Sequence, residues 1–176
     1  MKINKQLSRP VAIVATLLAL LALLALPASA QDQTDAFSQV VEHYEKAHLS
    51  LTQDSTAGVA QSGEHIVRLL TALEADFSAE RAGIDPLSAA SIRQLLPELK
   101  NAAKQLATAS DLSQTREAFY ALSKPLVRWR KAAASDDRPI VAYCSMTRRS
   151  WLQPQGEIAN PYHGQSMLRC GEVVDR

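Results

Sequence analysis

The chain has 176 residues, of which 47% are hydrophobic, 21% are charged and 5% are aromatic, and its formal net charge is +1. The near-neutral balance predicts no strong attraction to nucleic acid or to an anionic membrane surface. The composition is low in glycine and has no low-complexity tract beyond alanine-rich patches, so it is not typical of a disordered chain.

The first thirty residues have the parts of a secretory signal peptide. A basic start is followed by an unbroken apolar run from 11 to 26, and then by Ala28-Ser29-Ala30, a small-x-small cleavage site. The apolar run is shorter than the ~20 residues that a membrane-spanning helix needs. We therefore expect residues 1–30 to be cleaved, which leaves 31–176 as one domain in the periplasm or outside the cell, with no membrane span. The remaining domain has a net charge of −2, because the leader holds three basic and no acidic side chains.

Four amphipathic helices are predicted between residues 34 and 133, where apolar side chains recur every three or four positions. Helix starts are indicated at Asp54-Ser55, Asp85-Pro86 and Ser110-Asp111, which combine capping side chains with a proline tolerated in the first turn. Pro97 and Pro125 fall inside the third and fourth helices and predict kinks. The fold class expected is mainly α: an antiparallel four-helix bundle with a small C-terminal tail, rich in β-strand and turns, packed on it.

The tail, residues 138–176, lacks the helical pattern of apolar residues. Ile140 to Cys144 is a short β-prone run, and Met167 to Val174 contains the only other plausible strand, with turn residues between them. A lone strand would leave its backbone donors unpaired. We therefore expect the two runs to pair antiparallel and to bring Cys144 and Cys170 close together.

Cys144 and Cys170 are the only cysteines. In an oxidising compartment, the first expectation for such a pair is a disulfide. The bond would close a loop of about 27 residues, and in the chain-entropy account it would stabilise the fold by about 3 to 4 kcal/mol.

The same segment also offers a soft ligand set. Met146 lies two residues after Cys144, which places both on one face of a strand, and Met167 lies three residues before Cys170, as on one side of a helical turn. Two thiolates and two thioethers suit Cu(I) or Ag(I), with His163 as a fifth candidate donor, and zinc fits the set less well. Buried methionine more often fills a core than binds a metal. The residues alone therefore favour the disulfide and leave the metal site open.

The turn signals of the tail have a structural interpretation. The segment Asn160-Pro161-Tyr162-His163-Gly164 predicts a tight turn in which Gly164 is free to adopt a positive φ. Trp151 and Tyr162 are predicted to anchor the tail onto the helices, because large aromatic side chains bury the most surface.

At these residues the sequence resembles a known family. The signature lies in Tyr143-Cys144-Ser145-Met146, Ser150-Trp151-Leu152, 157–164 and 167–171, with further similarity at 47–73 and 116–123. It is similar to a family of periplasmic domains of unknown function, found alone or joined to adaptor subunits of copper/silver efflux pumps of the Cus type. Ser145 stands where the family pattern usually has proline. The resemblance implies soft-metal handling, with an efflux adaptor or another envelope protein as partner, and adds weight to the metal interpretation.

Other chemistries find little support in the sequence. Glu45-x-x-His48 has no second copy, as a di-iron bundle would need, and no C-x-x-C-H motif for covalent haem is present. No orienting group for a cysteine nucleophile is visible, so we expect no catalysis. His43 and His65 are expected to be solvated, and His48 to be a partly buried helix residue.

Overall fold

The computed structural model describes residues 34–175, and the predicted signal peptide lies outside the described residues. Within them the protein is mainly helical with a small antiparallel sheet. The helices are α2 (Ala36–Thr52), α3 (Val59–Ala75), α4 (Ala89–Thr108) and α5 (Leu112–Ala132), and a short 3₁₀ turn at Pro86–Ser88 precedes α4. These segments confirm the four helices predicted from the apolar period. None of the helices in this part of the chain is both long and apolar enough to cross a membrane.

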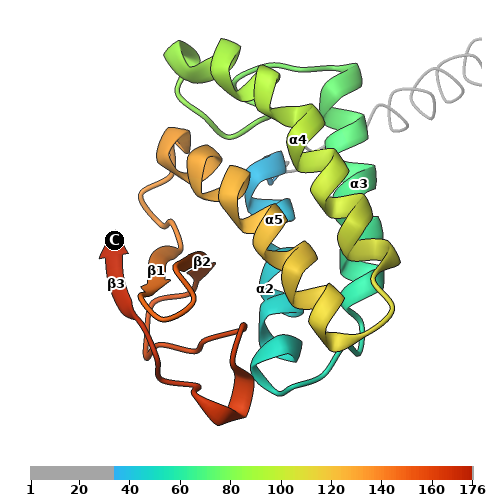
Figure 1. The fold of residues 1–176 in the computed structure, drawn as a ribbon. Helices are drawn as coiled ribbons and strands as arrows, with labels where there is room; N and C mark the ends of the chain where they lie inside the picture. The colour runs from blue at the N-terminus through green and yellow to red at the C-terminus, as the bar shows by residue number, and fades with distance from the viewer. Residues whose placement is uncertain (1–33, 176) are drawn as a thin grey trace, which may run out of the picture. The chain divides into compact units, whose positions relative to one another are not determined.

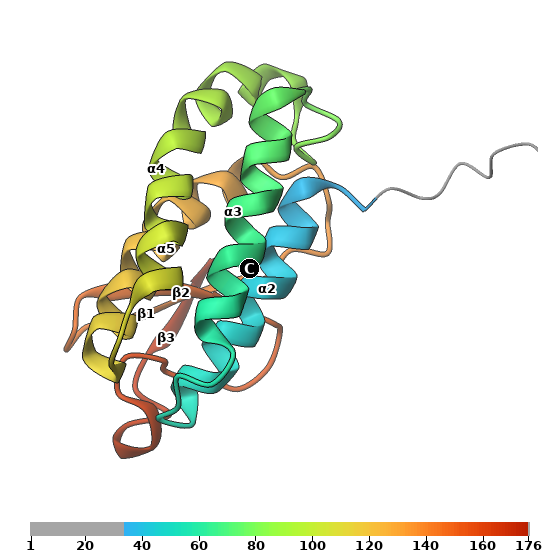
Figure 2. The same ribbon diagram turned by 90° about the vertical axis from the view of Figure 1, so that its right-hand side faces the viewer.

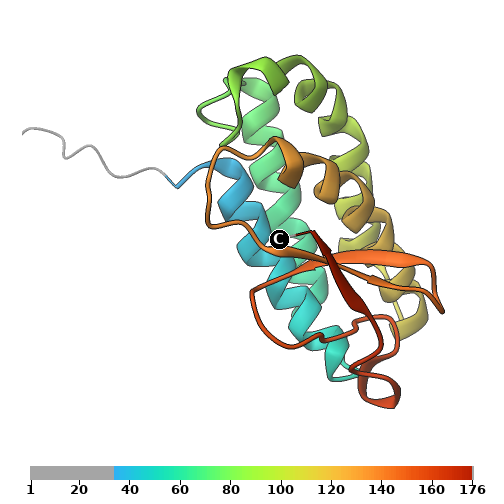
Figure 3. The ribbon, with the colours of Figure 1, turned by 90° about the vertical axis from the view of Figure 1, so that its left-hand side faces the viewer.

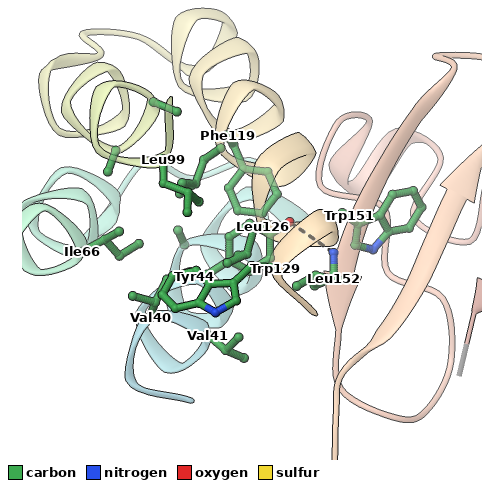
Figure 4. Close-up of a cluster of buried hydrophobic side chains, with 14 of the residues drawn as sticks. Val40, Val41, Tyr44, Ile66, Leu99, Phe119, Leu126, Trp129, Trp151 and Leu152 are labelled. Carbon is green, nitrogen blue, oxygen red and sulfur yellow. Dashed lines mark hydrogen bonds between the residues drawn. The ribbon is translucent and has the colours of Figure 1, made fainter. Parts of the chain in front are cut away.

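The helices pack in chain order, α2 against α3, α3 against α4 and α4 against α5, and α5 also contacts α2 (Figures 1 and 2). A β-carbon placed on Gly63 of α3 would lie 2.7 Å from the backbone nitrogen of Ala107, so the two backbones approach closely there. The core between the helices is apolar and aromatic, with Tyr44, Phe119 and Trp129 inaccessible to solvent (Figure 4). Burial of the apolar faces of the helices provides the main driving force for folding of the helical part.

Two of the predicted helix starts carry the expected capping bonds. Asp111 accepts a hydrogen bond from the backbone of Gln114 at the start of α5, and Asp85 accepts one from Leu87 before α4. The prediction that Asp54-Ser55 caps the second helix is wrong, because α3 begins after Gly58 with no capping side chain. α4 and α5 continue through Pro97 and Pro125.

The tail forms a three-stranded antiparallel sheet of β1 (Ile140–Cys144), β2 (Arg149–Gln153) and β3 (Glu172–Asp175), in the order β2-β1-β3 (Figure 3). The predicted antiparallel pairing of the first and last runs is confirmed by the β1–β3 ladder. Two details were wrong. The tail has a further strand, β2, and the last strand begins at Glu172, because Met167 to Cys170 forms turns.

Polar contacts at both edges of the sheet join the tail to the helices. The buried hydroxyl of Tyr44 in α2 accepts a hydrogen bond from the backbone N–H of Leu152 in β2 (Figure 4). Arg130 of α5, only 1% exposed, forms an ion pair with Asp175 of β3 at 2.7 Å and donates to the carbonyl of Pro139. The two edge strands of the sheet, β2 and β3, are thereby fixed to different helices.

A second group of contacts holds the turn segment. Asp54, just beyond α2, pairs with Arg116 of α5 at 2.5 Å and accepts from the backbone of Gln165. Arg116 also donates to the carbonyl of Pro161 at 2.9 Å. The backbone of Gly164 passes directly against the Asp54 carboxylate with a φ of 52°, so a side chain there would collide with it. Gly164 therefore adopts the positive φ predicted for it.

Candidate thiol and soft-metal site

The two cysteines lie next to each other at the end of the sheet where β1 ends and β3 begins. Cys144 is the last residue of β1, Cys170 lies two residues before β3, and their Sγ atoms are 3.0 Å apart. Both thiols are unbonded. Cys144 has no exposed surface, whereas Cys170 is partly exposed. The prediction that the cysteines are neighbours is confirmed, and the antiparallel pairing of β1 with β3 produces it.

Asn160 positions the Cys170 side of this pair. Its side-chain amide donates to the carbonyl of Cys170 at 2.7 Å, and its side-chain oxygen accepts from the backbones of Tyr162 and His163. Its own backbone N–H donates to the carbonyl of Leu168. Because Asn160 is completely buried, these bonds are shielded from water and hold the turn at 160–164 against the cysteine segment.

The two thiols differ in acidity. Burial alone would raise the pKa of Cys144. The hydrogen bond from the Cys170 thiol and those from the backbones of Thr147 and Met146 outweigh burial and lower the pKa to about 7. The pKa of Cys170 is raised, because its thiol donates to Cys144 and lies beside the developing negative charge. Near neutral pH Cys144 is therefore divided between thiol and thiolate, and the Cys170 thiol donates a hydrogen bond to the thiolate form.

The methionines occupy different environments. Met146 is 66% exposed and lies in the turn 145–148 between β1 and β2, so the expectation that it shares a strand face with Cys144 is wrong. Its exposure also rules out a core-filling role. Met167 is partly buried and follows a 3₁₀ turn at Gly164–Ser166, and its carbonyl accepts from the Cys170 backbone. Met146 lies in the turn that follows Cys144, and Met167 lies in the turn segment that precedes Cys170.

His163 is held in the turn by its backbone bond to the Asn160 side chain. Its side-chain Nε2 atom is shielded from solvent and has no hydrogen-bond partner among residues 34–175. An unpaired polar atom in such a place costs free energy unless a ligand or water satisfies it. The imidazole thus retains a lone pair or an N–H available to a ligand.

The donors present fit a soft monovalent ion better than zinc. Structural zinc is bound by four cysteine, histidine or carboxylate ligands, and residues 34–175 contain no cluster of three such side chains arranged to hold a metal. Cu(I) and Ag(I) accept thiolate and thioether ligands and need fewer of them. The close pair of Cys144 and Cys170, with a thioether in each neighbouring turn, has that chemistry.

The remaining residues of the tail signature are structural. Tyr162 stacks edge-on against Trp151, Phe119 and Tyr120, and its hydroxyl donates to the carbonyl of Ser150. The Trp151 indole donates to the side chain of Gln153. Trp151 and Tyr162 are both buried, which confirms them as the anchors of the tail. Pro161 is buried as well, between Asn160 and Tyr162.

Thr147 was not identified from the sequence. Its backbone N–H stabilises the Cys144 thiolate, whereas its buried hydroxyl has no hydrogen-bond partner among residues 34–175. No residue type signals a backbone donor, which becomes available only because a tight turn follows the strand at 145–148.

No protein-family model, curated protein or solved structure matches the chain.

The histidines of the helices differ from the sequence expectation in one respect. His48 is buried, as expected in part, and its Nε2 donates to the carbonyl of Ala159 at 2.7 Å. Burial lowers the pKa of His48 to about 4, and the bond to Ala159 opposes this shift. His43 and His65, expected to be solvated, are instead stacked on each other and partly buried.

Proposed function

We propose that the protein is an exported, non-catalytic accessory domain that binds Cu(I) or Ag(I) and serves heavy-metal efflux or homeostasis. In this proposal the four helices form an antiparallel bundle that acts as a scaffold, and the tail carries the site. The observation that supports it is the 3.0 Å separation of the Cys144 and Cys170 sulfurs, with soft thioether donors in both adjoining turns.

The acidity of Cys144 favours this function. Metal binding requires a thiolate, and a thiol with a pKa near 9 must release its proton at a cost in affinity at neutral pH. With its pKa lowered to about 7, Cys144 is already a thiolate in about half of the molecules at neutral pH. In those molecules binding displaces only the proton that Cys170 donates to Cys144.

The exposure of Met146 suits exchange of the ion with a partner. In this proposal the exposed thioether of Met146, two residues after the buried Cys144, contacts an incoming ion first and passes it inward, because thioether ligands bind more weakly than thiolates. His163, with its unpaired and shielded Nε2, is the assisting ligand in this proposal. The proposed partner is an efflux adaptor or another envelope protein, a choice supported by the resemblance of the tail to domains joined to efflux adaptors.

The test is a titration of the fully reduced chain with Cu(I) against a competing chelator. We expect one ion per chain, with binding lost in Cys144→Ser/Cys170→Ser and weakened on the order of 10-fold in Met146→Leu. Leu87→Ala, at a 95% exposed position before α4, is the matched control for loss of a surface apolar side chain and retains full affinity. Equal affinity of the double serine variant and the original chain would exclude this function.

A second candidate function rests on the same sulfurs in their oxidised form. The pair would then be a staple that holds the tail of a non-catalytic interaction domain of the bacterial envelope. The sulfurs need to approach from 3.0 Å to about 2.05 Å, while two protons and two electrons pass to the disulfide of an oxidoreductase.

A thiol count distinguishes the two functions. Protein purified without reductant and with its thiols trapped immediately has no free thiol if the staple is the native form, and its intact mass is lower by that of two hydrogen atoms. Two free thiols would exclude the staple. Copper or silver released on denaturation of that sample would identify the metal-bound form directly.

A further inference from the structure

A pocket lined by cationic and hydrogen-bond-donating side chains lies on the helical part, outside the tail. It has a volume of about 330 Å³ and lies between α2 and the first turns of α3. His43 and Lys46 line it from α2, and Gln61, Ser62 and His65 line it from α3. Among the described residues that line it, none is an aspartate or a glutamate. Such a lining favours an anion over a cation.

Ser62 is a buried donor at this pocket. It is only 5% exposed, it lines the pocket, and its hydroxyl makes no hydrogen bond with any residue in the range 34–175. Thr71 and Thr108, by contrast, donate to the carbonyl four residues earlier in their helices. A buried hydroxyl without a partner costs free energy unless a ligand or water satisfies it. The Ser62 side chain therefore offers a hydrogen bond to a molecule in the pocket.

The start of α3 adds backbone donors beside Ser62. Gly58 precedes the helix with a φ of 74° and supplies no capping side chain, and it also lines the pocket. In α2 and α5, the carboxylates of Asp35 and Asp111 cap the first turn. The first N–H groups of a helix have no partner within it and form the positive end of its dipole. An anion in the pocket can therefore take the place at α3 that a carboxylate fills in the other two helices.

Lys46 and the two imidazoles supply the positive charge. Lys46 pairs with Glu42 at 2.6 Å, but both side chains are more than half exposed, so the pair is weak and Lys46 can turn toward the pocket at little cost. The His43 and His65 rings are stacked with centroids 4.5 Å apart. Burial lowers the pKa of His43, and positive charge on His65 and Lys46 lowers it further. Arg68 acts in the same direction and Glu42 in the opposite one. An anion beside the stack would offset this repulsion.

We propose that this pocket binds a small tetrahedral oxyanion of the phosphate or sulfate type, held by Lys46, Ser62 and the first turn of α3, with protonated His43 and His65 beside it. Such an anion presents strong acceptor oxygens in several directions, which matches donors that converge from two helices. Binding is coupled to protonation of imidazole, so the affinity rises as the pH falls. The pocket shares no residue with the Cys144 and Cys170 pair, so this proposal does not depend on metal binding in the tail.

The test is a titration of the full chain with sodium sulfate, followed by the ring proton NMR signals of the histidines at an ionic strength held constant with sodium chloride. Sulfate has the same charge at pH 6 and pH 8, so a change in affinity reports on the imidazoles. We expect the signals of His43 and His65 to shift and that of His48, which is buried against Ala159, to stay in place. The affinity at pH 6 should exceed that at pH 8 on the order of 10-fold. Inorganic phosphate should shift the same signals.

Two substitutions examine the donors. Lys46→Gln and Ser62→Ala should each weaken sulfate binding on the order of 10-fold, because each removes a hydrogen bond to a charged group. Lys104→Gln is the matched control, since it removes the same charge from an exposed position of α4 outside the pocket and should leave the affinity unchanged.

Equal affinity of the original chain and all three variants would overturn the proposal, and so would imidazole signals that sulfate and phosphate leave in place. Vesicles of phosphatidylglycerol provide a further arm. If they shift the signals of His43 and His65 while free phosphate does not, the pocket belongs to a membrane-binding surface and the proposal of a small free anion is wrong.

Discussion

The hydroxyl of Tyr44 accepts a hydrogen bond from the backbone N–H of Leu152 at 3.2 Å and thereby joins α2 to β2. The same hydroxyl lies 2.7 Å from the hydroxyl of Ser123. Ser123 donates its own proton to the carbonyl of Phe119, so Tyr44 is the donor in that bond. One buried phenol on α2 thus bonds polar groups on two other elements, β2 and α5.

Replacing Tyr44 with phenylalanine is expected to lower the free energy of unfolding by about 1–3 kcal/mol, because it leaves the buried Leu152 N–H without this partner. Urea unfolding followed by circular dichroism measures the change. Tyr120→Phe is the matched control: its ring is partly exposed and packs on Tyr162 edge-on, and the expected change is below about 0.5 kcal/mol. Equal effects of the two substitutions would contradict the role of the Tyr44 hydroxyl.

His48 makes the stability depend on pH. Its pKa is about 4 in the folded protein and near 6.5 in an unfolded chain, so the unfolded state takes up a proton first as the pH falls. Above pH 6.5 the titration of His48 leaves the free energy of unfolding unchanged. Between pH 6.5 and pH 4 it lowers this free energy, and at pH 4 the reduction is about 3 kcal/mol.

His48→Gln retains an amide that can donate to the carbonyl of Ala159 and removes the titration. We expect the variant to show a flatter decline of the unfolding free energy between pH 6.5 and pH 4 than the original chain. The measurement is a series of urea titrations across that range. Parallel curves for the two proteins would show that His48 is not the group responsible.

The burial of the two cysteines predicts that the less acidic thiol, Cys170, is alkylated before the more acidic one, Cys144. Cys144 is the more acidic thiol but has no exposed surface, so alkylating reagents should reach the partly exposed Cys170 first. Its raised pKa makes this reaction slow near neutral pH. Cys144→Ser removes the neighbouring negative charge and should therefore accelerate alkylation of Cys170 at pH 7.5.

Peptide mapping after brief treatment with iodoacetamide identifies the modified residue and its rate. Cys170→Ser is the companion variant, in which the remaining buried thiol should stay largely unmodified until the protein is unfolded. First modification at Cys144 in the native chain would mean that its acidity, rather than access, controls the reaction.

The four helices and the proximity of the two cysteines were predictable, because they depend on residue patterns that are local in the sequence. Amphipathic periodicity identified the four helices, and the β-branched run ending at Cys144 identified β1. Strand β2 was missed because Arg149–Gln153 has no β-branched residue and becomes a strand through pairing with β1 and packing on α5. Asp54 resembled a cap, but its partner Arg116 is 62 residues away and no local pattern indicates it.

Gly171 provides the sharpest test of how the fold sets the distance between the sulfurs. It follows Cys170 directly, with a φ of 144°, and a β-carbon there would lie 2.8 Å from the Trp151 ring and 3.1 Å from the carbonyl of Tyr143. The Trp151 ring is fully buried and cannot move aside easily. Alanine at this position must therefore shift the backbone that carries Cys170.

Gly156→Ala is the matched control for this substitution. Gly156 has nearly the same φ, 143°, but a β-carbon there would meet nothing within 4 Å, so both variants share the backbone strain and only Gly171→Ala adds a collision. We expect Gly171→Ala to be less stable than Gly156→Ala by about 1–3 kcal/mol. It should also form the Cys144–Cys170 disulfide more slowly under a fixed glutathione buffer, because the sulfurs no longer start 3.0 Å apart. Equal stability and equal oxidation rates in the two variants would show that contact with Trp151 does not position Cys170.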